Sequence, residues 1–243
     1  MKFRAFALPG CVALLGLSAA NASEVYGDPS TPIAGRVHDT VIHTNDAEEL
    51  RYVILKTLTD RYAEQKDITV SDAEIDAYVA RMAADMARDR QEQEARRDEL
   101  VRQLAASDLS ADERAKLESE LETATQMVAN LAPQSGDSAE EIGEIEAARR
   151  DIAGAFIRQW KINRALYEQY GGRIIFQQGG PEPLDAYREI LEEREERGDF
   201  AIRNEQLAED FWSYYRNDAL HSFYEPGSRE EKQAFGSPWW QAP

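Results

Sequence analysis

Cysteine and histidine, the residue types most used in nucleophilic and zinc chemistry, are scarce in this chain of 243 residues. It has one cysteine, Cys11, and three histidines, His38, His43 and His221, so neither a Cys/His metal site nor a Cys-His catalytic pair can be assembled. His38 and His43 are five residues apart, but nothing near them supplies a third and a fourth zinc ligand. Motifs of serine hydrolases, P-loops, dinucleotide sites and HExxH zinc sites are also missing. We therefore expect no catalytic residue, no metal and no cofactor.

Carboxylates are abundant, but their arrangement does not indicate catalysis. The chain carries 46 Asp and Glu against 28 Lys and Arg, a formal charge of −18. Among so many acids, pairs at helical spacing such as Glu192 and Glu196 arise by number alone and are typical of a solvated helix face. A charge of this sign repels phosphate backbones, so nucleic acid is not an expected partner.

The aromatic residues indicate binding rather than chemistry. Within one turn of a predicted helix stand Phe211, Trp212, Tyr214 and Tyr215. Residues this close together on a helix point in several directions and cannot all enter one core. They either clamp the helix between its neighbours or line a binding surface.

A second aromatic feature is the pair Trp239-Trp240, almost at the C-terminus and flanked by prolines. This pair either tucks the tail onto the body or forms part of a partner surface. Holding an unfolded chain requires only apolar surface with scattered aromatic rings. The candidate client-binding residues are Trp160, Phe211, Trp212, Tyr215, Trp239 and Trp240.

The N-terminus has the pattern of a secretory signal peptide. Lys2 and Arg4 precede an apolar stretch from Ala5 to Ser18, and Ala20-Asn21-Ala22 fits a cleavage site, so we expect export to the periplasm with cleavage after Ala22. A membrane anchor and a lipoprotein signal are the alternatives, but the apolar stretch is shorter than the roughly 20 residues of a spanning helix. After Ser23 no segment approaches that length, and we expect no stable membrane insertion.

The elements that must position the aromatic residues are predicted to be mainly α-helices. Asn45 is the expected N-cap of a first helix, with Glu48 three residues later. Apolar residues then follow at spacings of three and four, which predicts a half-buried amphipathic helix. These residues are Leu50, Val53, Ile54, Leu58 and Tyr62. Ser71 and Glu74 form a capping box that starts a second helix.

The second helix changes character after Met86. From Ala87 to Glu99, nine of thirteen residues are charged, so this stretch cannot face a core. We expect a projecting helical hairpin arm over residues 87–131, with another capping box from Ser110 to Glu113. Its seam is predicted to consist of Leu100, Leu104, Leu117 and Leu121.

Glycines and prolines divide the second half of the chain. Residues 132–138 are the clearest linker, and a long helix is predicted from about Ala139 to the pair Gly171-Gly172, since glycine readily closes a helix. The buried side of this helix is expected to carry Ile142, Ile145, Ile152, Phe156, Trp160, Leu166 and Tyr170.

Strands are predicted to be scarce. Ile174-Ile175-Phe176 is the only convincing candidate, and the lead-in to Ile42 reads as turn-rich. Further helices are expected over 181–197 and 204–218. The chain then divides into a signal peptide (1–22), a helical module with a hairpin arm (23–131), a linker (132–138), a long helix with a second helical module (139–225) and a turn-rich tail (226–243). The fold class is mainly α with at most one small β element.

The segment from Ile68 to Tyr78 contains Thr69-Val70-Ser71-Asp72-Ala73-Glu74-Ile75 directly after an amphipathic helix. This order resembles the N-terminal domain of SurA-type periplasmic chaperones and related parvulin-family foldases. The resemblance implies a helical chaperone-like domain. Residues 173–178, the helix with Ile190, and Gly198-Asp199-Phe200-Ala201 also resemble the opening of a parvulin isomerase domain. A G-G-D-L-G motif is missing, so the resemblance assigns no catalytic residue.

Three functions follow from these patterns. The first is an exported helical chaperone or assembly factor that binds unfolded or envelope proteins without catalysis. The second is a divergent parvulin-like peptidyl-prolyl isomerase. The third is an adaptor that binds one folded partner through the arm or the tryptophan tail. A broad apolar cradle would favour the first over the third, whereas a compact patch would favour the third.

Overall fold

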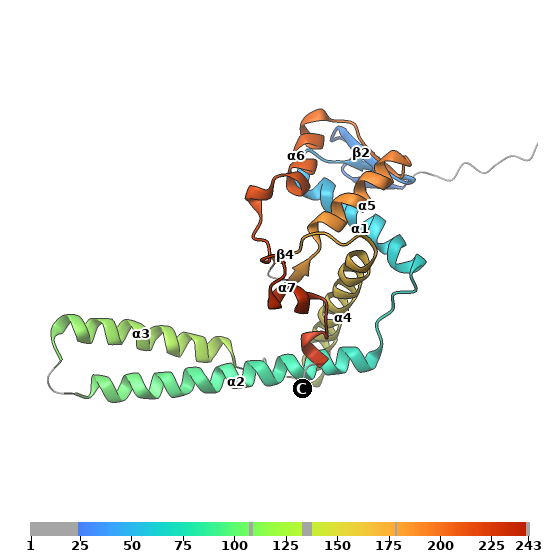
Figure 1. Ribbon diagram of the computed structural model, residues 1–243. Coiled ribbons are helices and arrows are strands. Elements are labelled where there is room, and N and C mark those ends of the chain that lie inside the picture. Colours follow the sequence, from blue (N-terminus) through green and yellow to red (C-terminus); the bar gives the residue numbers. More distant parts are fainter. Residues whose placement is uncertain (1–23, 107–108, 133–137, 178, 242–243) are drawn as a thin grey trace, which may run out of the picture.

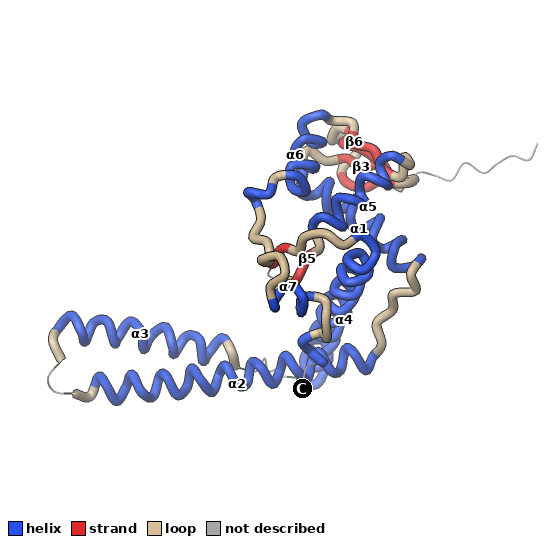
Figure 2. Tube along the Cα trace, in the orientation of Figure 1, coloured by secondary structure: helices blue, strands red, loops and turns tan. Residues whose placement is uncertain are grey.

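The computed structural model describes residues 24–106, 109–132, 138–177 and 179–241 (Figure 1). The signal peptide predicted over residues 1–22 lies outside these ranges, as do residues 133–137 of the predicted linker. The described chain is mainly helical with a few small strands, which confirms the predicted fold class (Figure 2).

The first helix, α1, spans Ala47–Gln65 and buries the predicted apolar stripe, from Leu50 to Tyr62. Its N-cap is Asp46 rather than the expected Asn45. The Asp46 carboxylate accepts hydrogen bonds from the backbone N–H groups of Glu48 and Glu49. A carboxylate suits this place because it accepts from free backbone donors and complements the positive end of the helix dipole.

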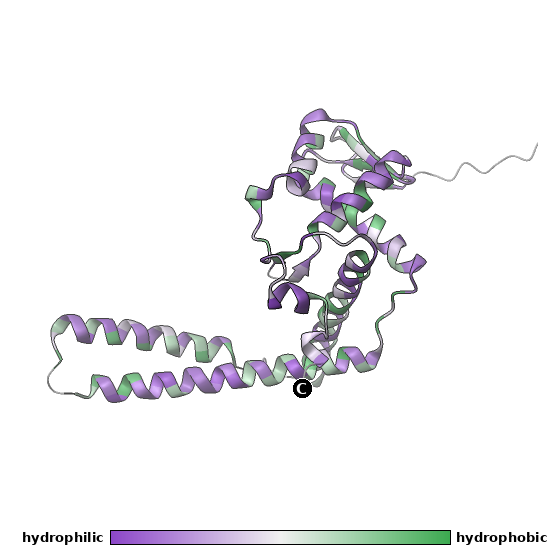
Figure 3. Cartoon of the chain, in the orientation of Figure 1, coloured by the Kyte–Doolittle hydropathy of each residue, from purple (hydrophilic) through white to green (hydrophobic). Residues whose placement is uncertain are grey.

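Helices α2 (Asp72–Leu104) and α3 (Ala111–Asn130) form the predicted hairpin arm, which projects from the body (Figure 1). Both predicted capping boxes are present, at Ser71 and at Ser110. Leu100 is fully buried in the seam, and Arg96 of α2 pairs with Glu120 of α3. Most of the arm surface is hydrophilic (Figure 3), so the hairpin is solvated along most of its length.

The long helix α4 spans Ala139–Tyr170 and ends as predicted at Gly171, which has a φ of 68°. Its predicted buried side is partly wrong, because Ile142, Ile152 and Phe156 are exposed. The helix buries Ala153 and Ile157 instead, against Tyr78 of α2. The face next to this contact, which carries Phe156, is left open.

Two small sheets are present in the described chain, rather than the single β element expected near residues 174–176. Three strands lie in the lead-in that was expected to be turn-rich, and a fourth lies near residue 200. The four-stranded sheet has the order β1 (Val25–Gly27), β3 (Thr40–His43), β2 (Ile33–Val37) and β6 (Phe200–Ile202).

Gly35 explains how the distant strand β6 joins this sheet. A Cβ atom at Gly35 would lie 2.4 Å from the carbonyl oxygen of Ala201, so only glycine permits the observed backbone approach. Strands β2 and β6 pair in antiparallel direction, with Val37 opposite Phe200. The sheet therefore ties the start of the described chain to its last third.

The second sheet consists of β4 (Ile175–Gln177) and β5 (Gly180–Glu182). Phe176 and Tyr224 also donate backbone hydrogen bonds across to Ser222 and Ile174. Helix α5 spans Leu184–Glu196 instead of starting at residue 181, because the preceding residues pair with β4. The remaining elements are α6 (Glu205–Arg216), the 3-10 turns η1 (Asp218–Leu220) and η2 (Trp239–Gln241), and α7 (Arg229–Ala234).

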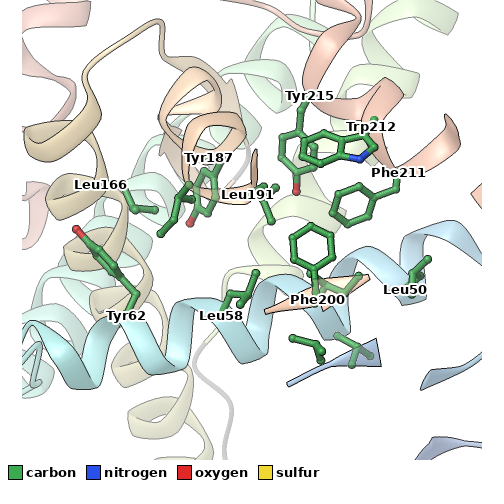
Figure 4. Close-up of a cluster of buried hydrophobic side chains, with 14 of the residues drawn as sticks. Leu50, Leu58, Tyr62, Leu166, Tyr187, Leu191, Phe200, Phe211, Trp212 and Tyr215 are labelled. Carbon is green, nitrogen blue, oxygen red and sulfur yellow. The ribbon is translucent and has the colours of Figure 1, made fainter. Parts of the chain in front are cut away.

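The main core forms where α1, α4, α5, α6 and the larger sheet meet (Figure 4). Phe200 of β6 lies between α1 and α6, with its ring centroid 5.8 Å from that of Phe211. Leu50, Phe211 and Tyr215 are almost completely buried here. A smaller cluster at the crossing of α2 and α4 contains Tyr78, Ala153, Ile157 and Trp240.

We predict that the outer part of the arm can be removed without unfolding the body. Replacement of residues 96–121 by a short Gly/Ser linker should leave one cooperative thermal transition, with Tm shifted by a few degrees at most, because a solvated hairpin adds little to the core. Circular dichroism during heating measures this. Loss of the transition would show that the arm is integral to the fold.

Candidate functional site

The candidate site is a cleft lined by aromatic side chains where α2, α4, the β4–β5 hairpin and the C-terminal tail meet. Its volume is about 780 Å³. We define the aromatic cleft by its aromatic lining residues, which are Tyr78, Phe156, Trp160, Phe176, Tyr224, Trp239 and Trp240.

Local structure sets the direction of the rings contributed by the body. The capping box at Ser71 fixes the start of α2, two turns before Tyr78. In β4 successive side chains alternate, so Ile175 is buried and Phe176, 65% exposed, faces out. Phe156 is 43% exposed on the open face of α4 and lies near Gly179 in the β4–β5 turn.

The tail forms the other wall of the cleft. Trp240 is buried between two rings of the body, with its centroid 5.5 Å from those of both Tyr78 and Trp160. Trp239 stands edge-on to Tyr78 at 4.8 Å and stays 44% exposed. The two tryptophans therefore tuck the tail onto the body, as one of the two sequence interpretations held, and also present a partly open ring to the cleft.

The structure divides the six predicted client-binding residues into two groups. Trp160, Trp239 and Trp240 meet in the aromatic cleft. Phe211, Trp212 and Tyr215 lie together in the main core, where each is at least nine-tenths buried (Figure 4). Their burial supports the alternative interpretation of that aromatic turn, in which the rings clamp α6 between its neighbours.

Four cleft aromatics were not among the predicted site residues: Tyr78, Phe156, Phe176 and Tyr224. For Phe176 the sequence held a usable signal, since a strand bounded by glycines exposes alternate residues. For Phe156 the helical stripe was misleading, because it does not reveal which face of the helix the neighbouring helix α2 covers. Tyr224 is placed by its backbone hydrogen bond to Ile174, a contact that spans fifty residues.

The side chains that line the cleft are mostly aromatic and carry little charge. Glu230 is the one charged side chain that lines it in the described part of the chain, and the other polar lining side chains are an amide and a hydroxyl, apart from the aromatic heads. Among the residues that the structure describes, no cluster of three or more His, Cys, Asp or Glu is arranged to hold a metal ion. His43 instead places Nδ1 2.6 Å from the carbonyl oxygen of Thr31, and His38 lies 4.0 Å from Asp199.

A polar network lies behind the β4–β5 hairpin. The Tyr214 hydroxyl contacts Glu182 at 3.4 Å and accepts a hydrogen bond from Gln177 at 3.1 Å. The Arg51 guanidinium lies 4.3 Å from the centre of the Tyr214 ring. Burial raises the pKa of Glu182 above its ordinary value, and this outweighs the opposing influence of Tyr214, His221 and Arg51. Because Glu182 does not line the cleft, we assign this network to the join between β5, α1 and α6.

A second groove, of about 540 Å³, lies where the arm meets the body. It is lined by Val79, Met82 and Met86 of α2, by Leu131 after α3 and by Arg149 of α4. This groove has no aromatic ring among its lining residues, and none of the six predicted site residues reaches it.

Comparison of the chain with protein-family models, with curated proteins and with solved structures finds no match in any of the three. In the described ranges, none of the helices combines the length and the apolar character that crossing a bilayer requires.

Core and cleft aromatics should differ sharply in their effect on stability. Phe211→Ala should lower the free energy of unfolding by about 3–5 kcal/mol, because it empties a closed core site. Phe156→Ala should lower it by less than about 1 kcal/mol, because that ring is already partly hydrated. Urea unfolding measures both values. Equal losses would contradict the division into a core group and a cleft group.

Glu182 should make stability depend on pH. Since its pKa is higher in the folded than in the unfolded chain, the folded state gains most below about pH 4.3, the ordinary glutamate pKa, and loses this gain as the pH rises through the folded-state value. Glu182→Gln should therefore raise Tm at pH 7 relative to wild type and change it little at pH 4. The exposed Glu189→Gln, on α5, is the matched control and should show no such difference between the two pH values.

Proposed function

We propose that this protein is an exported helical chaperone or assembly factor, related to SurA-type periplasmic chaperones, that holds unfolded or envelope proteins without catalysis. The observation that carries the proposal is the aromatic cleft. Seven rings from five separate parts of the chain converge on one open cavity, and three of them, Phe156, Phe176 and Trp239, remain substantially exposed.

The kind of surface supports an apolar ligand. A soluble domain gains stability by burying its large rings, so half-exposed rings gathered at one cavity indicate an interaction site. Aromatic side chains contribute large contact areas at a small entropic cost, because they have few rotatable bonds. With one carboxylate at Glu230, the cleft can accept varied apolar side chains without strict polar matching.

The cavity's size supports a segment of chain rather than a whole folded surface. A volume of about 780 Å³ is comparable with that of pockets that enclose small ligands or a few side chains. An adaptor for one folded partner would instead favour a flat, continuous patch. The other exposed large apolar residues, such as Tyr52, Val101 and Leu220, are scattered over separate elements.

The isomerase alternative receives no specific support from the geometry. Lowering the barrier to proline isomerisation, about 18–20 kcal/mol, requires preorganised polar groups around the twisting amide. In the described residues 173–202, where the parvulin resemblance lay, several polar side chains are instead engaged in ion pairs. Arg173, for example, pairs with Asp185 and Asp218.

Export rests on the N-terminal pattern. The basic residues Lys2 and Arg4, the apolar stretch and the Ala20-Asn21-Ala22 site support delivery to the periplasm. Edman sequencing of the protein from the periplasmic fraction should give Ser23 as its first residue.

An aggregation assay tests the holding function. The chain lacking residues 1–22 should suppress aggregation of a diluted unfolded outer-membrane protein at near-stoichiometric ratios. It should leave the rate of a proline-limited peptide assay unchanged. The double variant Phe156→Ala, Phe176→Ala should weaken suppression by at least about fivefold in half-maximal concentration, because each ring contributes roughly 0.5–1.5 kcal/mol of contact energy and the two together contribute about 1 kcal/mol or more.

The matched control is Tyr52→Ala, which removes an exposed ring on α1 outside the cleft. It should suppress aggregation as well as wild type. Equal activity of the control and the double variant would reject the cleft as the client site. Proline isomerisation well above background, lost on mutation within residues 173–202, would make the chain an enzyme.

A further inference from the structure

The C-terminal tail, residues 226–241 as described, is attached to the body in an unusual way. Between these residues and the described residues before Glu225, the structure contains no hydrogen bond and no ion pair. The polar contacts of the tail are internal, such as those from Glu231 to Ser228 and Gly227. Tail and body therefore meet through apolar surface.

Three aromatic side chains of the tail pack on rings of the body. Phe235 packs on Tyr167 with ring centroids 5.1 Å apart. Trp240 enters the space between Tyr78 and Trp160, and Trp239 stands against the outer side of Tyr78. A contact of this kind tolerates substitution of one apolar occupant by another, because it depends on area and not on matched polar groups.

The seat of Trp240 is also incompletely matched. The indole Nε1–H is buried and has no hydrogen-bond partner. A buried tryptophan N–H normally finds an acceptor, and leaving it unpaired weakens the docked state relative to a released, hydrated tail. Burial of the rings therefore stabilises the docked state of the tail, and desolvation of the Trp240 N–H donor destabilises it.

The place that the tail occupies belongs to the aromatic cleft. Tyr78 and Trp160, which hold Trp240, also line the cavity, and the exposed Phe156 stacks on Tyr78 at 6.3 Å. Removal of Trp240 would extend the open cavity into the α2–α4 crossing, where Ala153 and Ile157 are fully buried. The turn at Gly227, with a φ of 78°, is a suitable hinge because only glycine adopts this conformation without strain.

We propose that the tail is a displaceable strap. Trp240 occupies the part of the cleft that an apolar side chain of an unfolded polypeptide occupies when that polypeptide binds. This inference rests on the holding function proposed above and adds its regulation. The free chain keeps the seat between Tyr78 and Trp160 covered, and a client must compete with the tail. The observed association constant is then the intrinsic association constant multiplied by the fraction of molecules whose tail is released.

Hydrogen–deuterium exchange on the full chain tests the strap without any substitution. Addition of an unfolded outer-membrane protein fragment at saturating concentration should increase exchange in residues 226–241, because the tail leaves its seat. If the tail were instead a fixed wall that contacts the client, exchange there would decrease. A decrease, or no change at saturation, overturns the strap.

Affinity measurements give an independent test. Fluorescence anisotropy with the same labelled fragment should show about tenfold tighter binding to the chain lacking residues 226–243 and to the full chain with Trp240→Ala. A synthetic peptide of residues 226–243 should compete with the fragment for the shortened chain. Tyr52→Ala, outside the cleft, should leave the affinity at the wild-type value.

The outcomes separate the strap from the holding function. Weaker or unchanged binding by the two tail variants, while the wild-type chain binds and depends on Phe156, overturns the strap alone. If the wild-type chain and both variants all fail to bind the fragment, the holding function itself is wrong.

Discussion

The structure depends on the burial of one face of α1. Leu50, Ile54 and Leu58 lie within three turns and are almost fully enclosed, which no single neighbouring element can achieve. Cover comes from strand β2 just before the helix and from α6 more than 150 residues later. The two distant segments are held in place by the pairing of β2 with β6, which Gly35 permits. Between these covering segments the chain leaves the body along α2 and α3 and returns along α4, whose Ile162 and Leu166 join the main core (Figure 1).

The excursion explains why an aromatic cleft arises where it does. Helices α2 and α4 cross outside the main core. The side chains that are fully buried at this crossing, Ala153 and Ile157, are smaller than an aromatic ring. Two helices alone cannot cover a ring as large as Tyr78 on all sides. The tail supplies the missing cover with Trp240, and the β4–β5 hairpin approaches from the body with Phe176. The space that these separate pieces do not fill is the cleft.

Features that depend on residues close together in the sequence could be predicted, and features that depend on distant segments could not. The capping boxes at Ser71 and Ser110 and the stop at Gly171 involve groups within a few residues, so their chemistry is legible in one short window. The β2–β6 pairing and the seat of Trp240 bring together segments about 165 and 80 residues apart. A periodic stripe also cannot show that Phe156 lies on a face of α4 that stays partly open, although Ala153 and Ile157 beside it are buried against α2. The hairpin β2–β3 had a local signal, two short apolar runs around His38-Asp39, but Gly35 interrupts the first run.

The exposed aromatic rings and the net charge have opposite effects on self-association. Clustered apolar surface promotes self-association, whereas a formal charge of −18 makes copies of the chain repel one another. The arm adds to this effect, because it is rich in charged residues and most of its length is hydrophilic (Figure 3). Repulsion acts between whole molecules over about one Debye length, roughly 8–10 Å, whereas contact with an apolar side chain acts within the cleft itself. On the proposed function, the same chain would resist association with its own copies and still bind an uncharged or basic unfolded segment, and that binding should strengthen relative to self-association as the salt concentration falls.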